Sequence, residues 1–218
     1  LRAALPEPPS SRAASLSTQA STTGACTGFR AADLWVVLSL PSLQMLTETR
    51  ANRLPNVAAG LGLDEVTLAD VLNRRNFSSH AVGKWHLGYH KTPYTPTFRG
   101  FESFYGYYEG SEDYFAHGTS DGLDLHDEPR PFCGPGCTTR PWGARGQYST
   151  NLYSARAVDV IERHDASRGL FLYLAYQGVH GPRQAPESYV APYAKRIADP
   201  VRRTFAGMVA ALDEGLGN

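Results

Sequence analysis

Three segments of the chain repeat apolar residues at the spacing of an α-helix. The first helix is expected from Asp64, a candidate N-cap, to about Arg75. The second is expected at about Thr150–His164, and the third begins near Asp199-Pro200, a cap followed by proline at the first helical position. The positions that define the three apolar faces are Val66, Ala69, Val71 and Leu72, then Leu152, Ala155, Val158 and Ile161, then Phe205, Met208, Val209, Leu212 and Leu216.

Two further segments predict β-strands. Ser79–Gly83 is a short candidate, and Leu170–Ala175 is a continuous apolar run, which suits a strand buried on both faces of a parallel sheet. The turn-rich stretch from Tyr89 to about Gln147 predicts loops and short edge pieces instead of regular layers. Because helices and strands alternate, the expected fold is α/β, with a central, largely parallel sheet flanked by helices.

The N-terminal region differs in composition from the rest of the chain. Residues 1 to about 30 are rich in Ala, Ser, Thr and Pro, and we interpret residues 1–51 as a poorly ordered or atypical leader. Residues 52–218 are expected to form the folded domain. The apolar run Leu34–Leu40 is far too short to span a membrane, and no secretory signal is visible.

Composition and charge narrow the function classes. Hydrophobic residues make up 42% of the chain and charged residues 19%, as in soluble globular proteins. Basic and acidic residues balance at 21 each, which argues against a nucleic-acid partner, because such binding depends on cationic contacts to phosphate. An anionic substrate must therefore be held by local charges.

Candidate chemistry follows the two predicted strands. Lys84 and His86 come directly after the first, and His180 follows the second. Ligands of open α/β sheets bind beyond the carboxyl ends of the strands, so these side chains are expected at one rim. Lysine supplies a positive charge and imidazoles move protons, which suits an anion site or ester hydrolysis. Each residue alone also fits a role without catalytic function, as a solvated surface lysine or as a histidine that caps a turn.

Several motifs resemble one known family. Gly83-Lys84-Trp85-His86-Leu87-Gly88 is similar to the Gly-Lys-Trp-His-Leu-Gly signature of the sulfatases, whose fold resembles alkaline phosphatase. The resemblance covers about Asn52 to Asn218 and is closest to the arylsulfatase B (N-acetylgalactosamine-4-sulfatase) branch. The other matching segments are Arg99-Gly100-Phe101-Glu102, Gly110-Ser111-Glu112-Asp113-Tyr114, Gln147-Tyr148-Ser149-Thr150, Phe171-Leu172-Tyr173-Leu174-Ala175, Val179-His180-Gly181-Pro182 and Ala206-Gly207-Met208-Val209.

The resemblance implies roles for the candidate residues. Lys84 would bind sulfate oxygens, His86 would hold or deprotonate the hydroxyl of a hydrated formylglycine nucleophile, and His180 would contact sulfate or protonate the departing alcohol. A calcium ion with carboxylate ligands would orient the sulfate. The implied substrate is a sulfated carbohydrate or an aryl sulfate, and the implied location is lysosomal or extracellular. Asn76-Phe77-Ser78 is an acceptor for glycosylation in a secreted chain.

The sequence departs from the family pattern in two places. The nucleophile motif Cys-x-Pro-x-Arg is absent; Cys26 keeps the spacing to Arg30 but has glycine in place of proline, and Ser39 lies in a second, weaker match. An incidental Cys26 is the alternative. The Asp-Asp and Asp-Asn pairs that ligate calcium in the family are absent from the chain, so its metal ligands are unknown. These departures favour an interior fragment of an arylsulfatase.

Two other functions compete with sulfate ester hydrolysis. A catalytically incomplete relative would bind sulfated glycans through Lys84, His86 and His180. A phosphoesterase of the same fold is disfavoured, because the Gly-Lys-Trp-His and Val-His-x-Pro segments are sulfatase hallmarks.

Overall fold

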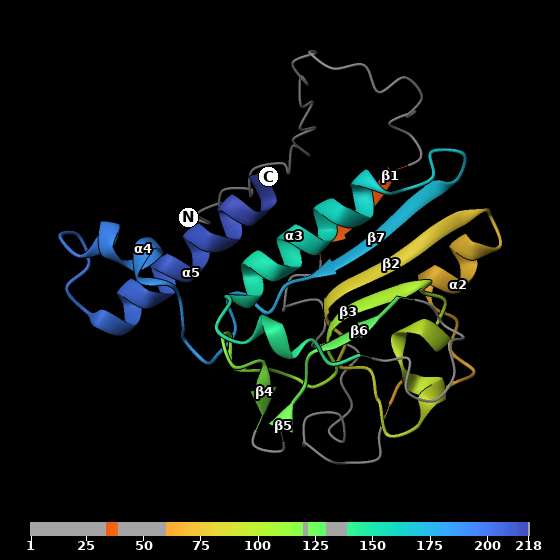
Figure 1. Cartoon of the computed structure of the whole chain (residues 1–218), viewed down its shortest axis with the longest axis horizontal. Helices are drawn as coiled ribbons and strands as arrows, with labels where there is room; N and C mark the ends of the chain where they lie inside the picture. The colour runs from red at the N-terminus through yellow and green to blue at the C-terminus, as the bar shows by residue number, and fades with distance from the viewer. Residues whose placement is uncertain (1–33, 39–59, 120–121, 130–138, 218) are drawn as a thin grey trace, which may run out of the picture.

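A five-stranded sheet forms the centre of the molecule (Figure 1). The computed structural model describes residues 34–38, 60–119, 122–129 and 139–217. The sheet has the order β1 (Leu34–Leu38), β7 (Gly169–Ala175), β2 (Phe77–Lys84), β3 (Ser103–Tyr107) and β6 (His126–Glu128). The first four strands are parallel, and β6 is antiparallel to β3. The predicted α/β fold with a largely parallel sheet is confirmed.

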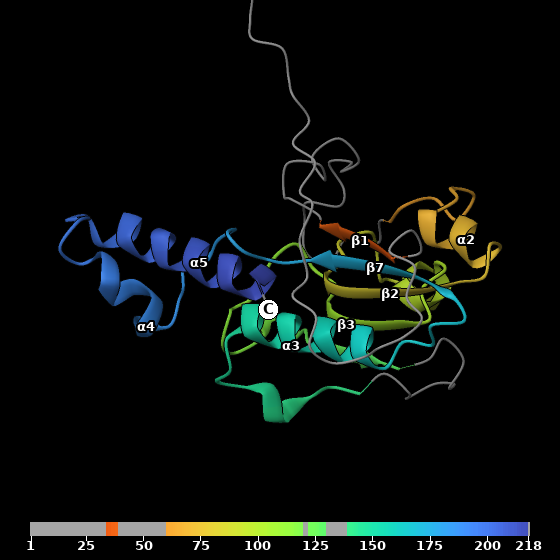
Figure 2. The same ribbon diagram turned by 90° about the horizontal axis from the view of Figure 1, so that it is seen from above.

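Helices cover both faces of this sheet, as Figure 2 shows from above. On one face, Val82 of β2 and Leu172 of β7 pack with Tyr153 of α3 (Ser149–Glu162). On the other, their neighbours Ala81 and Phe171 belong to a cluster that includes Ala69 of α2 (Leu68–Asn73). Adjacent residues of a strand thus enter opposite cores, which explains the continuous apolar run of β7. The remaining elements are β4 (Gly118–Thr119), β5 (Gly122–Leu123), α4 (Glu187–Val190), α5 (Pro200–Gly217) and the 3₁₀ turns Thr92–Tyr94, Pro96–Phe98, Trp142–Ala144 and Ala191–Tyr193.

The two predicted strands are present, and both are longer than predicted. The first candidate is β2, which begins at Phe77 and ends at Lys84. The apolar run is β7, and it lies between β1 and β2 with parallel pairing on both sides. The prediction of a buried parallel strand is therefore confirmed.

The first helix begins later than predicted. Thr67, and not Asp64, is the N-cap: Thr67 Oγ1 accepts a hydrogen bond from Asp70 N at 3.1 Å, and the Asp70 carboxylate accepts from Thr67 N at 3.0 Å. This reciprocal pair satisfies two backbone donors at once, which a single cap at Asp64 does not. The helix ends at Asn73, within the predicted range.

The second helix lies where it was predicted, but its buried face was assigned correctly only in part: Leu152 packs against the core. Tyr153, Ser154 and Ala157 are buried, whereas Ala155 is exposed and Ile161 is 39% exposed. A polar residue can face the core here because Ser154 Oγ bonds to Thr150 O and to the Tyr176 hydroxyl. The hydrophobic period alone did not identify this face.

The third helix, α5, begins after the predicted cap. Asp199 Oδ1 accepts from Arg202 N at 2.7 Å. Met208 is buried as expected. In contrast, between 40% and 47% of the surface of Phe205, Val209 and Leu216 is exposed. Small residues, Gly207 and Ala211, take the buried positions because the helix packs closely against α4 and α3.

The short strands β4, β5 and β6 fit the expected edge pieces, whereas β1 and β3 were not predicted. β3 lies in the stretch expected to hold loops and edge pieces, yet it pairs in parallel with β2 and is largely buried. Its Ser-Phe-Tyr-Gly-Tyr sequence did not predict a strand, because Gly106 resembles a turn signal. Glycine is needed here for close packing of the strands, since a Cβ at Gly106 would lie 1.9 Å from Gly83 O. β1 lies within residues 1–51, whose assignment as a leader stays a prediction.

Candidate active site

The predicted polar residues lie at or beyond the carboxyl ends of two adjacent strands. β2 and β7 are parallel neighbours, with Gly83 opposite Ala175, and Lys84 is the last residue of β2. His86 follows in the segment after β2, and His180 lies in the loop after β7. The structure therefore brings the two strands that carry Lys84, His86 and His180 to one edge of the sheet, where α/β proteins bind ligands.

The segment after β2 is fixed by Trp85 and bent at His86. The indole of Trp85 is 1% exposed, and its Nε1 donates to the carbonyls of Gly88 and Tyr94, both at 3.0 Å. His86 has a φ of 54°, in the left-handed region that residues with a Cβ rarely adopt, and its N donates to Tyr108 O at 3.0 Å. Such backbone conformations persist where the surroundings enforce them, and they cluster at functional sites.

The imidazole of His86 lies against the backbone of Gly110. A Cβ at Gly110 would be 3.0 Å from Cε1 and 3.1 Å from Nε2 of His86, so a larger residue would displace the ring. Asp124 holds the turn that leads to Gly110, because its carboxylate accepts from Tyr108 N at 3.2 Å and from Glu109 N at 2.9 Å. Sequence reasoning missed both contacts; the family motif that contains Gly110 was the available signal.

His180 is exposed, and its ring orientation is defined by a local hydrogen bond. Nδ1 lies 2.8 Å from the carbonyl oxygen of Gly181. Since a carbonyl oxygen only accepts, Nδ1 carries a hydrogen and Nε2 is the nitrogen that gains or loses a proton. The residue is thus suited to proton transfer with a group at the rim of the sheet.

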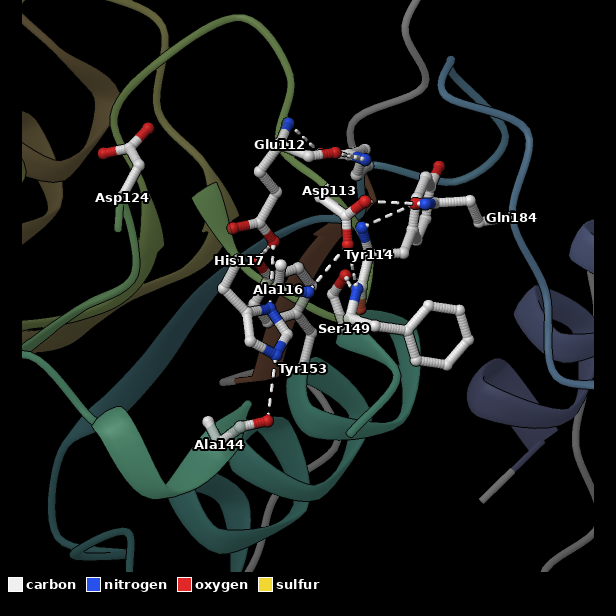
Figure 3. A network of polar contacts seen from close by, with 12 residues as sticks. Glu112, Asp113, Tyr114, Ala116, His117, Asp124, Ala144, Ser149, Tyr153 and Gln184 are labelled. Carbon is white, nitrogen blue, oxygen red and sulfur yellow. Dashed lines mark hydrogen bonds and ion pairs between the residues drawn. The ribbon is translucent and has the colours of Figure 1, made fainter. Parts of the chain in front are cut away.

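A buried polar network supports the loop between β3 and β4 (Figure 3). Tyr153 donates a short hydrogen bond to Glu112 Oε1, and His117 Nδ1 lies 3.7 Å from the same oxygen. Burial raises the pKa of Glu112. Burial by itself lowers the pKa of His117, but the interaction with Glu112 and the carbonyl of Ala144 outweigh it, so the net direction is upward. The hydrogen bond between Tyr153 and Glu112 holds the loop to α3.

The described residues include neither candidate nucleophile and no recognisable metal site. Cys26 and Ser39 lie outside the described residues. Among the residues that the structure describes, no group of three or more His, Cys, Asp or Glu side chains is arranged to hold a metal ion. The described residues therefore do not fit a calcium site.

Comparison with known proteins identifies the family. The family model described as Sulfatase matches residues 11–218. The chain belongs to the sulfatase family. The match extends through β1 and the segment before it, beyond the range of the motif resemblance.

Among curated sulfatases, the chain is 39% identical to arylsulfatase J of Mus musculus over 164 residues, which cover 72% of this chain and 26% of that protein. It is 42% identical to arylsulfatase G of Canis lupus familiaris over 146 residues, 56% of this chain and 26% of the relative. The chain thus spans about a quarter of the length of these relatives. The assignment to the arylsulfatase B branch stays a prediction.

Solved structures agree with the fold. The crystal structure of Ps i-CgsB has a TM-score of 0.61 and 29% identity, and the alignment covers 73% of this chain and 36% of that one. The same protein in complex with k-i-k-neocarrahexaose gives a TM-score of 0.60, over 76% and 37% of the two chains. Within the described part of this chain, no helix combines the length and apolarity needed to cross a membrane.

Proposed function

We propose that the protein containing this chain hydrolyses sulfate esters, with Lys84, His86 and His180 at its active site. The observation that carries the proposal is the exit of β2, where Lys84 ends the strand and His86 is held in a left-handed conformation against Gly110. Membership of the sulfatase family supports the reaction class.

The reaction breaks the bond between sulfur and the ester oxygen. A nucleophile attacks sulfur, the alcohol departs with a proton, and water then releases sulfate. Lys84 stabilises negative charge on the sulfate oxygens and the leaving group. His86 holds or deprotonates the nucleophile's hydroxyl, and His180 delivers the proton to the alcohol through Nε2.

The nucleophile is proposed to be a formylglycine made from Cys26, with Ser39 as the alternative position. Calcium is the cofactor that the family resemblance implies for the complete enzyme, and its ligands are unknown. Both assignments follow from the family resemblance.

The proposed substrate is a sulfated carbohydrate. The support is a related protein of 29% identity that was crystallised in complex with k-i-k-neocarrahexaose. A lysosomal or extracellular location is proposed with it, which agrees with the exposed position of Asn76 in its acceptor triplet.

The experiment is hydrolysis of a fluorogenic aryl sulfate, with calcium, by the full chain and its Lys84→Ala variant. We expect the substitution to lower kcat/KM by roughly two to three powers of ten, as for the loss of one oxyanion donor. Leu68→Ala, on the exposed side of α2, is the control and should retain the parental rate. An equal rate in Lys84→Ala would remove Lys84 from the site.

Inactivity of the parental chain would indicate either that this part of the protein is not sufficient for turnover or the second candidate, a non-catalytic protein that binds sulfated glycans. Calorimetry with a sulfated oligosaccharide would then test for binding. Binding that is lost in Lys84→Ala would indicate a glycan site at Lys84, and no binding by the parental chain would indicate that there is no such site. Equal turnover of phosphate and sulfate esters would indicate a phosphoesterase instead.

A further inference from the structure

The loops that follow β3 and β7 are joined by the side-chain amide of Gln177. This amide forms two hydrogen bonds with the backbone of Glu112, as a neighbouring β-strand would. Gln177 Nε2 donates to Glu112 O at 2.7 Å, and Gln177 Oε1 accepts from Glu112 N at 2.8 Å. Both residues are 2% exposed, so the pairing is shielded from water. The main-chain carbonyl of Gln177 also accepts from His180 N at 2.9 Å. Gln177 therefore connects the Glu112 loop directly to the turn that carries His180.

Tyr114 makes a second connection to the same turn. Its hydroxyl donates to the carbonyl oxygen of His180 at 2.9 Å. The ring is fully buried and stacks on Tyr148 with the centroids 5.3 Å apart, while Ser149 N and Oγ hold the Tyr114 carbonyl at 2.9 and 3.1 Å. The start of α3 thus defines where this hydroxyl points.

A third connection lies beyond His180. Gln184 Nε2 donates to Asp113 Oδ2 at 2.6 Å, and its Oε1 accepts from Tyr114 N at 2.9 Å, as Figure 3 shows. The Gln184 carbonyl accepts from the Tyr148 hydroxyl at 3.0 Å. The chain is therefore tied to residues 112–114 on both sides of His180, and at His180 itself.

We propose that Tyr114 and Gln177 are positioning residues for His180. His180 is exposed, and its ring bonds to the adjacent Gly181, which does not tie it to another segment; within the described residues, its place at the rim depends on contacts to its backbone. Tyr114 and Gln177 provide these from buried positions: the Tyr114 hydroxyl binds the His180 carbonyl from the loop after β3, and the Gln177 carbonyl binds His180 N from the same loop as His180. This explains the Glu112-Asp113-Tyr114 motif without giving it contact with substrate. The kinetic consequence rests on the proposed function; the positional one does not.

The test uses the full chain labelled with ¹⁵N-histidine, with the His180 signals assigned by their loss in His180→Gln. We expect Tyr114→Phe to move the ¹⁵N chemical shifts of the His180 imidazole away from those of the tautomer with hydrogen on Nδ1, because the turn loses its hydrogen bond from the Tyr114 hydroxyl. Tyr176→Phe is the matched control: it also removes a buried hydroxyl, one that bonds Ser154 and Gly215. It should leave the His180 signals in place.

Gln177→Met, which removes both bonds to Glu112 at similar side-chain length, is the second variant. Unchanged His180 signals in folded Tyr114→Phe and Gln177→Met would overturn the proposal. Loss of the folded state in both would also overturn it, since it would assign the residues to stability.

Kinetics give an independent readout where the chain is active. Tyr114→Phe should lower kcat by roughly ten- to a hundredfold, as for a misplaced catalytic group, with KM within about twofold of the parental value. Tyr176→Phe should change neither constant. Where the parental chain is inactive, the nitrogen shifts alone decide the positioning role.

Discussion

The carbonyl oxygen of Ala175 occupies the space in which a side chain at Gly83 would begin. A Cβ built on Gly83 lies 2.0 Å from this oxygen, and Gly83 has a φ of 102°. The close approach joins the carboxyl ends of β2 and β7 one residue before Lys84. Glycine is therefore required by packing and by backbone conformation at the point where the strands deliver the candidate residues.

Gly83→Ala should consequently destabilise the protein by about 3 kcal/mol or more, because backbone atoms and not a flexible side chain must move. Chemical denaturation measures the change. Gly146→Ala is the matched control, since Gly146 also has a positive φ, 86°, but nothing lies within 4 Å of its added Cβ. It should cost only about 1 kcal/mol. Equal losses would show that backbone conformation alone, and not the contact with Ala175, makes glycine necessary.

Leu172→Ala tests the buried-strand assignment. Leu172 is fully buried between β1 and β2 partners and packs with Tyr153 of α3. We expect a loss of about 3 kcal/mol in the free energy of unfolding, from lost transfer energy and the cavity left behind. Val201→Ala, at a position 52% exposed, should change stability by less than about 0.5 kcal/mol. A negligible loss at Leu172 would contradict its place in the core.

The elements that could be predicted from the sequence are those with one dominant signal. β7 is an apolar run without polar interruption, and α5 has a cap and a proline at its start. β3 was missed because its glycine serves close strand packing, which is a contact with β2 and not a local property. The buried face of α3 was predicted only in part, because Ser154 reaches the core through hydrogen bonds that the apolar spacing does not reveal.

The candidate site could likewise be predicted from the sequence only in part. Placement of Lys84 and His86 followed from the end of a strand, which local sequence indicates. The contacts of His86 with Gly110, and of His180 with Tyr114, join segments far apart in the chain. Such contacts depend on sheet order, so sequence patterns did not reveal them.

Glu128→Gln should stabilise the protein at neutral pH. Burial raises the pKa of Glu128, and the hydrogen bond from Thr97 offsets this only in part. The folded state therefore binds the proton more tightly than the unfolded state, and stability falls as the pH rises through the raised pKa. The neutral amide avoids this loss, which we expect to be about 1–3 kcal/mol at pH 7–8. The difference should vanish below the ordinary pKa of 4.5.

Denaturation of both proteins at several pH values measures this effect. Glu102→Gln is the control of opposite sign, because Glu102 pairs with Arg168 at 2.7 Å on a partly exposed surface. It should lose up to about 1 kcal/mol at neutral pH. A Glu128→Gln variant that is less stable than the parent at pH 7–8 would show that ionised Glu128 is favourably solvated or paired.

Asn76 is predicted to carry an N-linked glycan when the chain is made in the secretory pathway of a eukaryotic cell. It is exposed at the turn before β2, and Asn76-Phe77-Ser78 is the only acceptor triplet in the sequence. Asn76→Asp removes the acceptor and suits the residue's φ of 62°, which aspartate tolerates better than most residues. We expect a mass increase in the parental chain that a peptide-N-glycosidase reverses, and no increase in Asn76→Asp. Asn73→Asp, three residues earlier and also exposed, should keep the glycan. A parental chain without added mass would count against glycosylation at this site, and with it against one support for the proposed location.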